Sequence, residues 1–310
     1  PVSQYDAEYT IANYLTYFPY DDIDPYDEDV YSWALNDVQE KLNIVYDDKQ
    51  MEAIRCFIEN DLMILTGGTG TGKTTVVRGM VSIFKQLYPS YQVMCAAPTG
   101  RAAKRLSELT DNDAVTLHSL LAWDLETNTF GKNEEEPLLI DLLIIDEFSM
   151  VDNFLFYNLV KAGRKIKKIC IIGDENQLPS VGPGCVLKDL IESDICPVIR
   201  LEHIFRQKEG SDVIGIAHDI TLGEVDLGLY HHDFSFIECN PYQIKDSVIK
   251  VVSAALEKGY DLSQIQVMAP LYNGPAGIDR LNNALQECFN PQSPYKRELK
   301  VGYRTYRIDD

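Results

Sequence analysis

The stretch "MILTGGTGTGKTT" (residues 63–75) joins an apolar run to a glycine- and threonine-rich loop that ends in a lysine and two hydroxyls. Residues 67–74 fit the pattern GxxxxGK[ST], placed between a predicted strand and a predicted helix. The glycines let successive backbone N–H groups approach phosphate oxygens, and the dipole of the following helix favours negative charge there. In this pattern Lys73 reaches the β- and γ-phosphates and the Thr74 hydroxyl coordinates Mg²⁺. The stretch therefore predicts a nucleoside triphosphate site.

The pattern around this loop is strand, loop and helix, repeated from residue 49 onward. Apolar runs without alternation indicate strands of a parallel sheet that helices cover on both faces. We expect these strands over residues 62–66, 92–97, 142–146 and 168–173. Helical periodicity between them predicts helices over 73–87 and 101–109. Ligands of such α/β sheets bind at the carboxyl ends of the strands, where the motifs lie.

A second, weaker α/β series follows this one. It predicts helices near 211–221, 242–258 and 276–289, and strands at 234–238 and 264–269. The closing "RELKVGYRTYRIDD" indicates one more strand. The predicted division of the chain is an acidic helical segment, a first α/β domain and the start of a second, incomplete one: 1–48, 49–205 and 206–310.

The composition indicates a soluble protein. Hydrophobic residues make up 45% of the chain, yet no run of eighteen apolar residues occurs, so no membrane span is predicted. No basic region followed by an apolar run opens the chain, so no secretory signal is predicted. The seven cysteines are scattered without a CxxC pair, which favours reduced, mostly buried thiols over a zinc site. We expect a cytoplasmic protein and a monomer.

The acidic residues concentrate near the start of the chain. Residues 1–48 hold twelve Asp/Glu and one Lys, so they supply −11 of the net charge of −20. An acidic total argues mildly against a nucleic-acid partner, although global charge does not decide a local channel. Helical spacing over 8–17 and 30–42 flanks an acidic loop. We interpret the segment as a small helical appendage with a solvated face, and a surface that docks a protein partner is the alternative.

Two acids end the strand predicted at 142–146. Asp146 is placed to hold Mg²⁺ and Glu147 to polarise the attacking water, so the pair favours hydrolysis over binding alone. The loop "GDENQLPSVGPG" (173–184) follows the next strand. Its Gln177 is placed to sense the γ-phosphate, and the stiff Pro/Gly run beyond is placed to touch a second ligand. Such a loop would couple nucleotide state to another binding surface, and a merely rigid turn is the alternative.

Four sequence motifs follow the phosphate loop in the same order as in a known protein family. They are "APTGRAAKRL" (97–106), "DEFSMVD" (146–152), "GDENQLPSVGPG" (173–184) and "LEHIFRQ" (201–207). Together with the phosphate loop that precedes them, these motifs resemble those of superfamily 1 helicases. More narrowly, they resemble the RecD-like 5′→3′ DNA helicases, which are relatives of the exodeoxyribonuclease V alpha chain. "MAPLYNGPAGIDRLNNALQ" (268–286) is similar to the second-domain signature of that family. The resemblance covers roughly residues 5–310 and implies RecA-like motor domains.

The resemblance also implies roles for matching residues. Gln50 resembles the glutamine that reads adenine, which implies ATP, and Arg206 resembles the arginine that reaches the γ-phosphate. The implied nucleotide-binding loop comprises Gly68, Thr69, Gly70, Thr71, Gly72, Lys73, Thr74 and Thr75. The implied contacts to a single DNA strand are Pro98, Thr99, Gly100, Arg101, Thr116, His118, Pro179 and Val181. For His118 an ordinary core or capping role is the alternative.

One insertion leaves its role open. Residues 123–138 resemble the small β-hairpin that lies near the strand-separation point in the family. Their chemistry is that of a polar hairpin in which Trp123 and Phe130 flank an Asn-containing tip. A wedge and a plain connector are equally consistent with it.

These observations predict the front part of an ATP-dependent helicase that translocates on single-stranded DNA in repair or recombination. Full-length relatives continue into a motif that completes the second motor domain and into an arginine motif. Such an arginine is worth roughly 10³–10⁵ in rate, so we expect the chain to bind ATP, hydrolyse it poorly and not unwind DNA unaided. The alternative is a nucleotide-gated module that grips DNA or protein. A small-molecule kinase is disfavoured, because no arginine-rich lid is present.

Overall fold

The computed structural model describes residues 2–20, 23–68, 70–202, 211–230, 232–308 and 310. The chain divides into two compact units, Pro1–Gly223 and Glu224–Asp310. The first unit thus includes the N-terminal segment and α9 (Asp212–Leu222).

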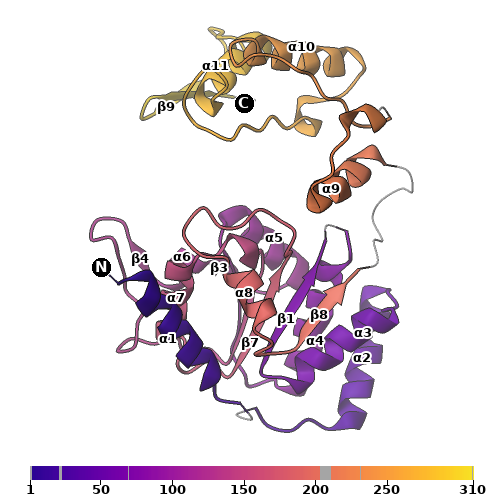
Figure 1. The fold of residues 1–310 in the computed structure, drawn as a ribbon, viewed down its shortest axis with the longest axis vertical. Coiled ribbons are helices and arrows are strands. Elements are labelled where there is room, and N and C mark those ends of the chain that lie inside the picture. The colour runs from indigo at the N-terminus through magenta and orange to yellow at the C-terminus, as the bar shows by residue number, and fades with distance from the viewer. Residues whose placement is uncertain (1, 21–22, 69, 203–210, 231, 309) are drawn as a thin grey trace. The chain divides into compact units, whose positions relative to one another are not determined.

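A six-stranded parallel sheet forms the centre of the first unit (Figure 1), with strand order β3-β2-β6-β7-β1-β8. Its strands are β1 (Leu62–Gly67), β2 (Val93–Ala97), β3 (Ala114–Thr116), β6 (Leu142–Ile145), β7 (Lys168–Gly173) and β8 (Val198–Leu201). The predicted parallel α/β fold and its predicted strands are confirmed. The additional strands β3 and β8 form the two edges of the sheet, and they are too short to show a period in the sequence.

Helices cover both faces of this sheet. They are α1 (Gln4–Thr16), α2 (Glu28–Leu42), α3 (Asp48–Glu59), α4 (Lys73–Leu87), α5 (Gly100–Thr110), α6 (Leu117–Leu120), α7 (Asn153–Ala162) and α8 (Val186–Glu192). Side chains alternate between the faces of a strand. In β6, Leu143 and Ile145 therefore join one hydrophobic core, and Leu142 and Ile144 join the other. A sheet covered twice needs apolar residues at successive positions, which explains the unbroken apolar runs.

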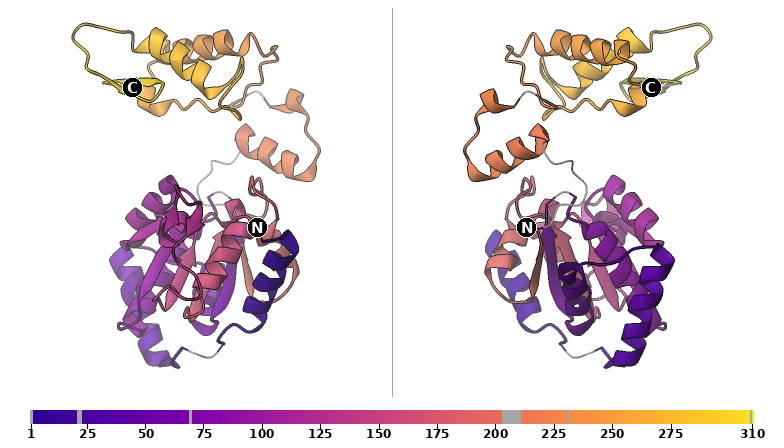
Figure 2. Two further views of the ribbon diagram at one scale, coloured as in Figure 1. Left: turned by 90° about the vertical axis from the view of Figure 1, so that its left-hand side faces the viewer. Right: turned by 90° about the vertical axis from the view of Figure 1, so that its right-hand side faces the viewer.

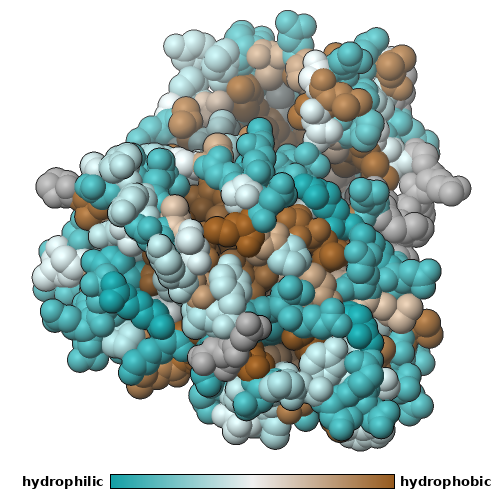
Figure 3. Space-filling model, turned by 60° about the horizontal axis from the view of Figure 1, so that its bottom comes forward, coloured by the Kyte–Doolittle hydropathy of each residue, from teal (hydrophilic) through white to brown (hydrophobic). Residues whose placement is uncertain are grey.

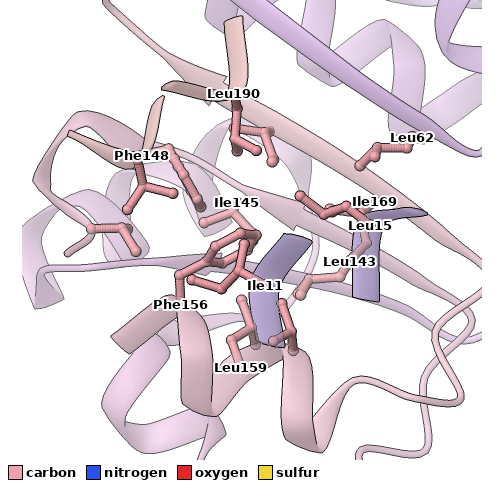
Figure 4. Close-up of a cluster of buried hydrophobic side chains, with 14 of the residues drawn as sticks. Ile11, Leu15, Leu62, Leu143, Ile145, Phe148, Phe156, Leu159, Ile169 and Leu190 are labelled. Carbon is pink, nitrogen blue, oxygen red and sulfur yellow. The ribbon is translucent and has the colours of Figure 1, made fainter. Parts of the chain in front are cut away.

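The acidic N-terminal segment contributes to both cores. Ile11 and Leu15 of α1 lie in the first core, where Ile11 is close to Phe156 of α7 (Figure 4). Ala34 and Val38 of α2 are buried in the second core. Figure 2 accordingly shows α1 and α2 on opposite sides of the sheet. The predicted helices are confirmed, but they are integral parts of the first unit and not an appendage beside it.

The second unit contains α10 (Ile244–Glu257), α11 (Ile278–Phe289), an antiparallel hairpin of β9 (Glu298–Val301) and β10 (Arg304–Arg307), and the short 3₁₀ turns η2 (Leu227–Leu229) and η3 (Leu262–Gln264). The predicted helices are confirmed. The strands predicted at 234–238 and 264–269 are wrong, because neither segment pairs in a ladder within the described residues. A strand requires the backbone groups of a neighbour, which local sequence does not supply. The predicted closing strand is instead a hairpin.

The surface reflects the charged composition. On the face seen in Figure 3, hydrophilic side chains predominate at the rim and hydrophobic ones show toward the middle. No helix within the described ranges is long and apolar enough to cross a membrane. All seven cysteines are free, and Cys95, Cys170 and Cys196 are buried as expected, whereas Cys185 and Cys288 are exposed.

Candidate active site

The phosphate loop connects β1 to α4. Gly70 and Gly72 both have a φ of 86°, a left-handed conformation that glycine adopts without steric cost. Lys73 begins α4, and its Nζ donates to the carbonyl oxygen of Gly68 at 2.9 Å and also to that of Gly67. The loop is therefore wrapped around the lysine ammonium.

A cavity of about 350 Å³ opens beside this loop. Residues of the loop and of two neighbouring strand ends line it, and the sequence predicted each of these: Gly68, Gly70, Gly72, Lys73, Thr74, Thr75, Asp146, Glu147 and Gln177. Thr71 of the loop is buried, and its hydroxyl donates to the carbonyl of Gly68 at 2.9 Å. Thr69 lies outside the described residues.

The two acids follow β6 directly and carry unusual pKa values. The Glu147 N–H donates to Oδ1 of Asp146 at 2.8 Å. Burial raises the pKa of Asp146, and burial together with the charge of Asp146 raises the pKa of Glu147. Lys73 and Arg105 act in the opposite direction on both carboxyls. Glu147 has a φ of 53°, a left-handed conformation that is uncommon for a non-glycine residue and often marks a functional site.

Burial also lowers the pKa of Lys73, which the nearby carboxylates of Asp174, Asp146 and Glu147 oppose. Charges of both signs are thus held in one partly desolvated site. Oxygen ligands such as a carboxylate and a threonine hydroxyl are those that Mg²⁺ prefers. Thr74 and Asp146 line the same cavity, so the residues present fit a magnesium nucleotide.

Gln177 belongs to the loop after β7. Its Oε1 accepts from the Ser149 hydroxyl at 3.5 Å, and its Nε2 donates to Oδ2 of Asp174 at 3.5 Å. Both distances are at the long limit for hydrogen bonds, so these bonds hold the amide weakly. Because Gln177 lines the cavity, its amide is available to a nucleotide.

The remainder of the same loop is ordered by its own contacts. The Ser180 hydroxyl donates to the carbonyl oxygens of Gly182 at 2.9 Å and Gly184 at 3.1 Å. Gly184 has a φ of 101°, which only glycine adopts readily. Pro179 and Val181 are exposed, Val181 fully. The loop therefore has one end in the cavity wall and a stiff, solvent-facing tip.

Six of the eight residues predicted to contact a DNA strand lie at the carboxyl ends of β2 and β3, and Pro179 and Val181 belong to the loop after β7. Thr99 caps α5, since its Oγ1 accepts from the Ala102 N–H at 3.2 Å. Thr116 caps α6 in the same way through the Ser119 N–H at 3.1 Å. The parallel pairing of Ala97 with Thr116 brings residues 98–101 beside residues 116–118.

His118 and Arg101 are exposed at this edge of the sheet, as is Gly100. The alternative of a core role for His118 is therefore wrong. Pro98 and Thr99 are half-buried. The side chains of His118 and Arg101 at this edge are therefore accessible to a ligand.

Gln50 is not in the lining of the cavity. Its N–H donates to Oδ1 of Asp47 at 2.8 Å, and its Oε1 accepts from the Asp47 N–H at 3.2 Å. These reciprocal bonds form a capping box at the start of α3, and they account for its burial. Arg206 lies outside the described residues.

The sequence of this chain is similar to those of known proteins over the region that contains this cavity. Residues 50–183, which include the phosphate loop and the acidic pair, match the AAA domain family. The chain is 32% identical over 259 residues to the ATP-dependent RecD2 DNA helicase of Deinococcus radiodurans, covering 84% of this chain and 34% of that protein. It is 29% identical over 286 residues to the RecBCD enzyme subunit RecD of Mycolicibacterium smegmatis, covering 79% and 51%. The chain is a homologue of the RecD-type helicases.

Both of these RecD-type relatives are longer than the part that matches, since the chain spans about a third of the first and about half of the second. The fold is also that of a solved helicase. The Pif1 helicase of Candida albicans aligns with a TM-score of 0.50 at 22% identity, covering 68% of this chain and 55% of that chain. The first unit thus has the RecA-like fold that the resemblance implied.

One charged residue that lines this cavity was not predicted. Arg105 of α5 lines the cavity and lowers the pKa of both acids. The signal that would have revealed it is helical spacing, because residues four apart on a helix share a face. Arg105 follows Arg101 by this interval, so one side of α5 carries a predicted strand contact and a cavity residue.

Proposed function

We propose that this chain is the ATP- and DNA-binding part of an ATP-dependent DNA helicase. It binds ATP with Mg²⁺ in the cavity and single-stranded DNA along the carboxyl edge of the sheet. Hydrolysis drives 5′→3′ translocation and duplex unwinding in DNA repair or recombination. One observation carries the proposal: the loop after β7 places Gln177 in the cavity wall and presents Val181 to solvent.

The nucleotide roles follow from the cavity lining. The backbone N–H groups of Gly68–Thr75 hold the phosphates, and Lys73 binds the β- and γ-phosphates once they replace its carbonyl partners. Thr74 and Asp146 hold Mg²⁺, which neutralises phosphate charge when it is bound. Glu147 orients the attacking water and accepts its proton, a role that its raised pKa favours.

Two further nucleotide roles rest on family resemblance. Gln50 reads adenine, which requires its side chain to leave the capping box, and Arg206 contacts the γ-phosphate. The domain division is likewise a proposal: residues 49–205 form the first motor domain and 206–310 begin the second.

The DNA roles belong to two neighbouring loops and one more distant one. Pro98, Thr99, Gly100 and Arg101 grip the backbone of the strand, and Thr116 and His118 extend this contact. Pro179 and Val181 contact the strand from the loop after β7. Such contacts recognise the backbone and base faces without reading sequence. The RecD2 relative is itself described as an ATP-dependent DNA helicase, which supports DNA as the ligand.

Coupling is the property that tests the proposal. The affinity for a fluorescent oligo(dT) should differ between the chain saturated with ADP and the chain saturated with a non-hydrolysable ATP analogue and Mg²⁺. Coupling free energies between sites correspond to about 5–150-fold changes in affinity. Equal affinities in the two nucleotide states would contradict the proposal.

Hydrolysis separates the helicase from the alternative, a nucleotide-gated module without motor activity. ATP turnover is measured with and without single-stranded DNA, on this chain and on a form extended by the region that follows it in RecD-type relatives. Stimulation by DNA that is lost in Glu147→Gln supports the motor. Coupled binding without turnover in either form supports the module.

A further inference from the structure

A rigid hairpin projects beside the predicted DNA edge. It consists of β4 (Trp123–Asp124) and β5 (Thr129–Phe130), which pair antiparallel. The rings of Trp123 and Phe130 have centroids 4.5 Å apart, and Phe130 also packs against the first core. At the turn, Oδ1 of Asp124 accepts from the Glu126 N–H at 2.8 Å. Packing at its base and hydrogen bonding at its tip therefore fix the hairpin.

One face of α7 lies opposite this hairpin. Phe154, Asn158 and Lys161 follow one another at intervals of four and three residues, so they share a face of the helix. The other side of α7 is buried in the first core, which leaves this face for contact with the hairpin and with solvent. Phe154 is 44% exposed.

A cavity of about 460 Å³ separates the hairpin from this face of α7. We call it the hairpin pocket, and the members used below are Trp123, Phe130, Lys132, Phe154, Asn158 and Lys161. Its size falls in the range of roughly 300–1,000 Å³ that is typical of ligand sites. It lies entirely within the first unit and is distinct from the nucleotide cavity.

The chemistry of the hairpin pocket combines aromatic faces with amides and cations. Lys161 lines the pocket, and its Nζ lies 5.3 Å from the ring centroid of Tyr157. Of the two acids that line the pocket, Glu134 pairs with Arg164 at 2.7 Å, and Glu135 is exposed. Aromatic faces stack on bases, amides bond base edges, and lysines contact phosphates.

We propose that the hairpin pocket binds an unstacked base of single-stranded DNA, held between Trp123 and Phe154. Lys132 and Lys161 contact the flanking phosphates, and the Asn158 carboxamide oxygen accepts a hydrogen bond from the base edge. The Asn158 amide nitrogen donates one of its two hydrogens to the Phe154 carbonyl at 2.8 Å, which orients the carboxamide and leaves its oxygen as an acceptor for a ligand. The hairpin is thus a stacking platform, and this inference rests on the proposed DNA-binding function.

His118 links the hairpin pocket to the proposed DNA edge. Its ring centroid lies 5.9 Å from that of Trp123, in an edge-to-face arrangement, and 5.9 Å from that of Phe130. His118 is exposed and lies two residues beyond Thr116. A strand that contacts Thr116 and His118 is therefore led directly to the aromatic side of the pocket.

The tryptophan content of the chain permits a direct test. Trp33 and Trp123 are the two tryptophans, and Trp33 lies on α2 in an exposed position. In Trp33→Phe, emission therefore comes from Trp123 alone. Oligo(dT) is titrated into this variant while DNA anisotropy and tryptophan emission are recorded together. We expect emission to be quenched over the same DNA concentrations at which anisotropy rises.

The outcomes separate the pocket from the proposed function. Rising anisotropy without quenching overturns the hairpin pocket and leaves the DNA-binding function standing. No rise in anisotropy contradicts the DNA-binding function, and the pocket with it.

A variant on the far wall excludes quenching by DNA that passes outside the pocket. In the Trp33→Phe background, Phe154→Ala should lower DNA affinity roughly tenfold, the scale of one base–aromatic stack, and reduce the quenching. Tyr17→Ala, which removes an exposed aromatic ring from the end of α1, is the matched control and should change neither. Unchanged affinity and quenching in Phe154→Ala would overturn the proposal. Far-UV circular dichroism verifies that each variant is folded.

Discussion

Two lysines at opposite edges of the central sheet make similar contacts and have different consequences. Lys73 lies at the carboxyl edge and Lys168 begins β7 at the amino edge. Each donates from Nζ to backbone carbonyl oxygens, Lys73 to that of Gly68 at 2.9 Å and Lys168 to that of Asn60 at 2.5 Å. Burial lowers the pKa of both, that of Lys168 to about 8.

Their surroundings distinguish the two. Lys168 is 1% exposed, lies over the Phe57 ring at 5.3 Å and bonds carbonyls at the end of α3, where a cation is favoured by the helix dipole. Lys73 instead faces a cavity whose glycine loop leaves room for phosphates. The same donor and acceptor types therefore stabilise the fold at one edge and prepare a binding site at the other. The predictions below test this contrast.

The largest expected difference between the two lysines is the effect of their substitution on the free energy of unfolding. Lys168→Ala leaves the buried carbonyl of Ile58 and the part-buried carbonyl of Asn60 without this donor and creates a cavity, so we expect a loss of about 3 kcal/mol in the free energy of unfolding. Lys73→Ala should change it by less than about 1 kcal/mol, because its carbonyls lie beside an open cavity. Urea unfolding followed by tryptophan emission measures both, since Trp33 and Trp123 lie in the first unit. Equal losses of unfolding free energy in the two variants would contradict the proposed difference between Lys73 and Lys168.

For nucleotide affinity, we expect the substitution of Lys73 to have a larger effect than that of Lys168. Lys73→Ala removes a charge-assisted hydrogen bond to phosphate, so the affinity for a fluorescent ATP analogue with Mg²⁺ should fall about 10–100-fold. Lys85→Ala, at an exposed position in the last turn of the same helix, is the control and should bind normally. A normal affinity in Lys73→Ala would remove the phosphate role of that residue.

The lowered pKa of Lys168 predicts a dependence of stability on pH. Between its folded pKa of about 8 and the ordinary value of 10.5, the unfolded chain binds more protons than the folded chain. Stability therefore rises with pH in this window, and the gain relative to Lys168→Met should reach about 2 kcal/mol near its upper end. The difference in unfolding free energy between the two proteins is measured from pH 7 to 10. A difference that is constant with pH would show that Lys168 titrates normally.

The smallest expected effect concerns Arg105. Its charge lowers the pKa of Asp146 and Glu147, so Arg105→Gln should raise both pKa values further. Because Mg²⁺ requires the ionised carboxylate, the pH profile of magnesium-nucleotide binding should move to higher pH. Lys104→Gln, next to it on the exposed side of α5, is the control. If both variants shift the profile equally, the effect is one of net charge and not of Arg105.

Short-range patterns in the sequence predicted much of the first unit. The four apolar runs became β1, β2, β6 and β7, and the glycine loop and the acids after β6 converged on one cavity. This convergence follows from chain direction, because parallel strands place their carboxyl ends at one edge. β3 and β8 were missed, since three or four residues at a sheet edge carry too little periodicity.

The wrong predictions concern segments whose structure depends on contacts with residues far away in the chain. Residues 234–238 and 264–269 have strand composition, yet they pair with no strand in the described part of the chain. The adenine role of Gln50 stays a prediction, because in the structure its side chain takes part in a capping box at the start of α3. The acidic segment 1–48 was interpreted as an appendage, because its few apolar positions do not reveal which surface they meet. In the structure they meet both faces of the sheet.

The sequence by itself determined the chemistry of the nucleotide site. The glycines, Lys73, Thr74 and the pair Asp146 and Glu147 are recognisable because local spacing fixes their place on a strand–loop–helix unit. Only the tertiary structure placed Arg105 against the acids and enclosed the hairpin pocket between β5 and α7. Those contacts join segments that are far apart in the chain, and they depend on packing, which no local period encodes.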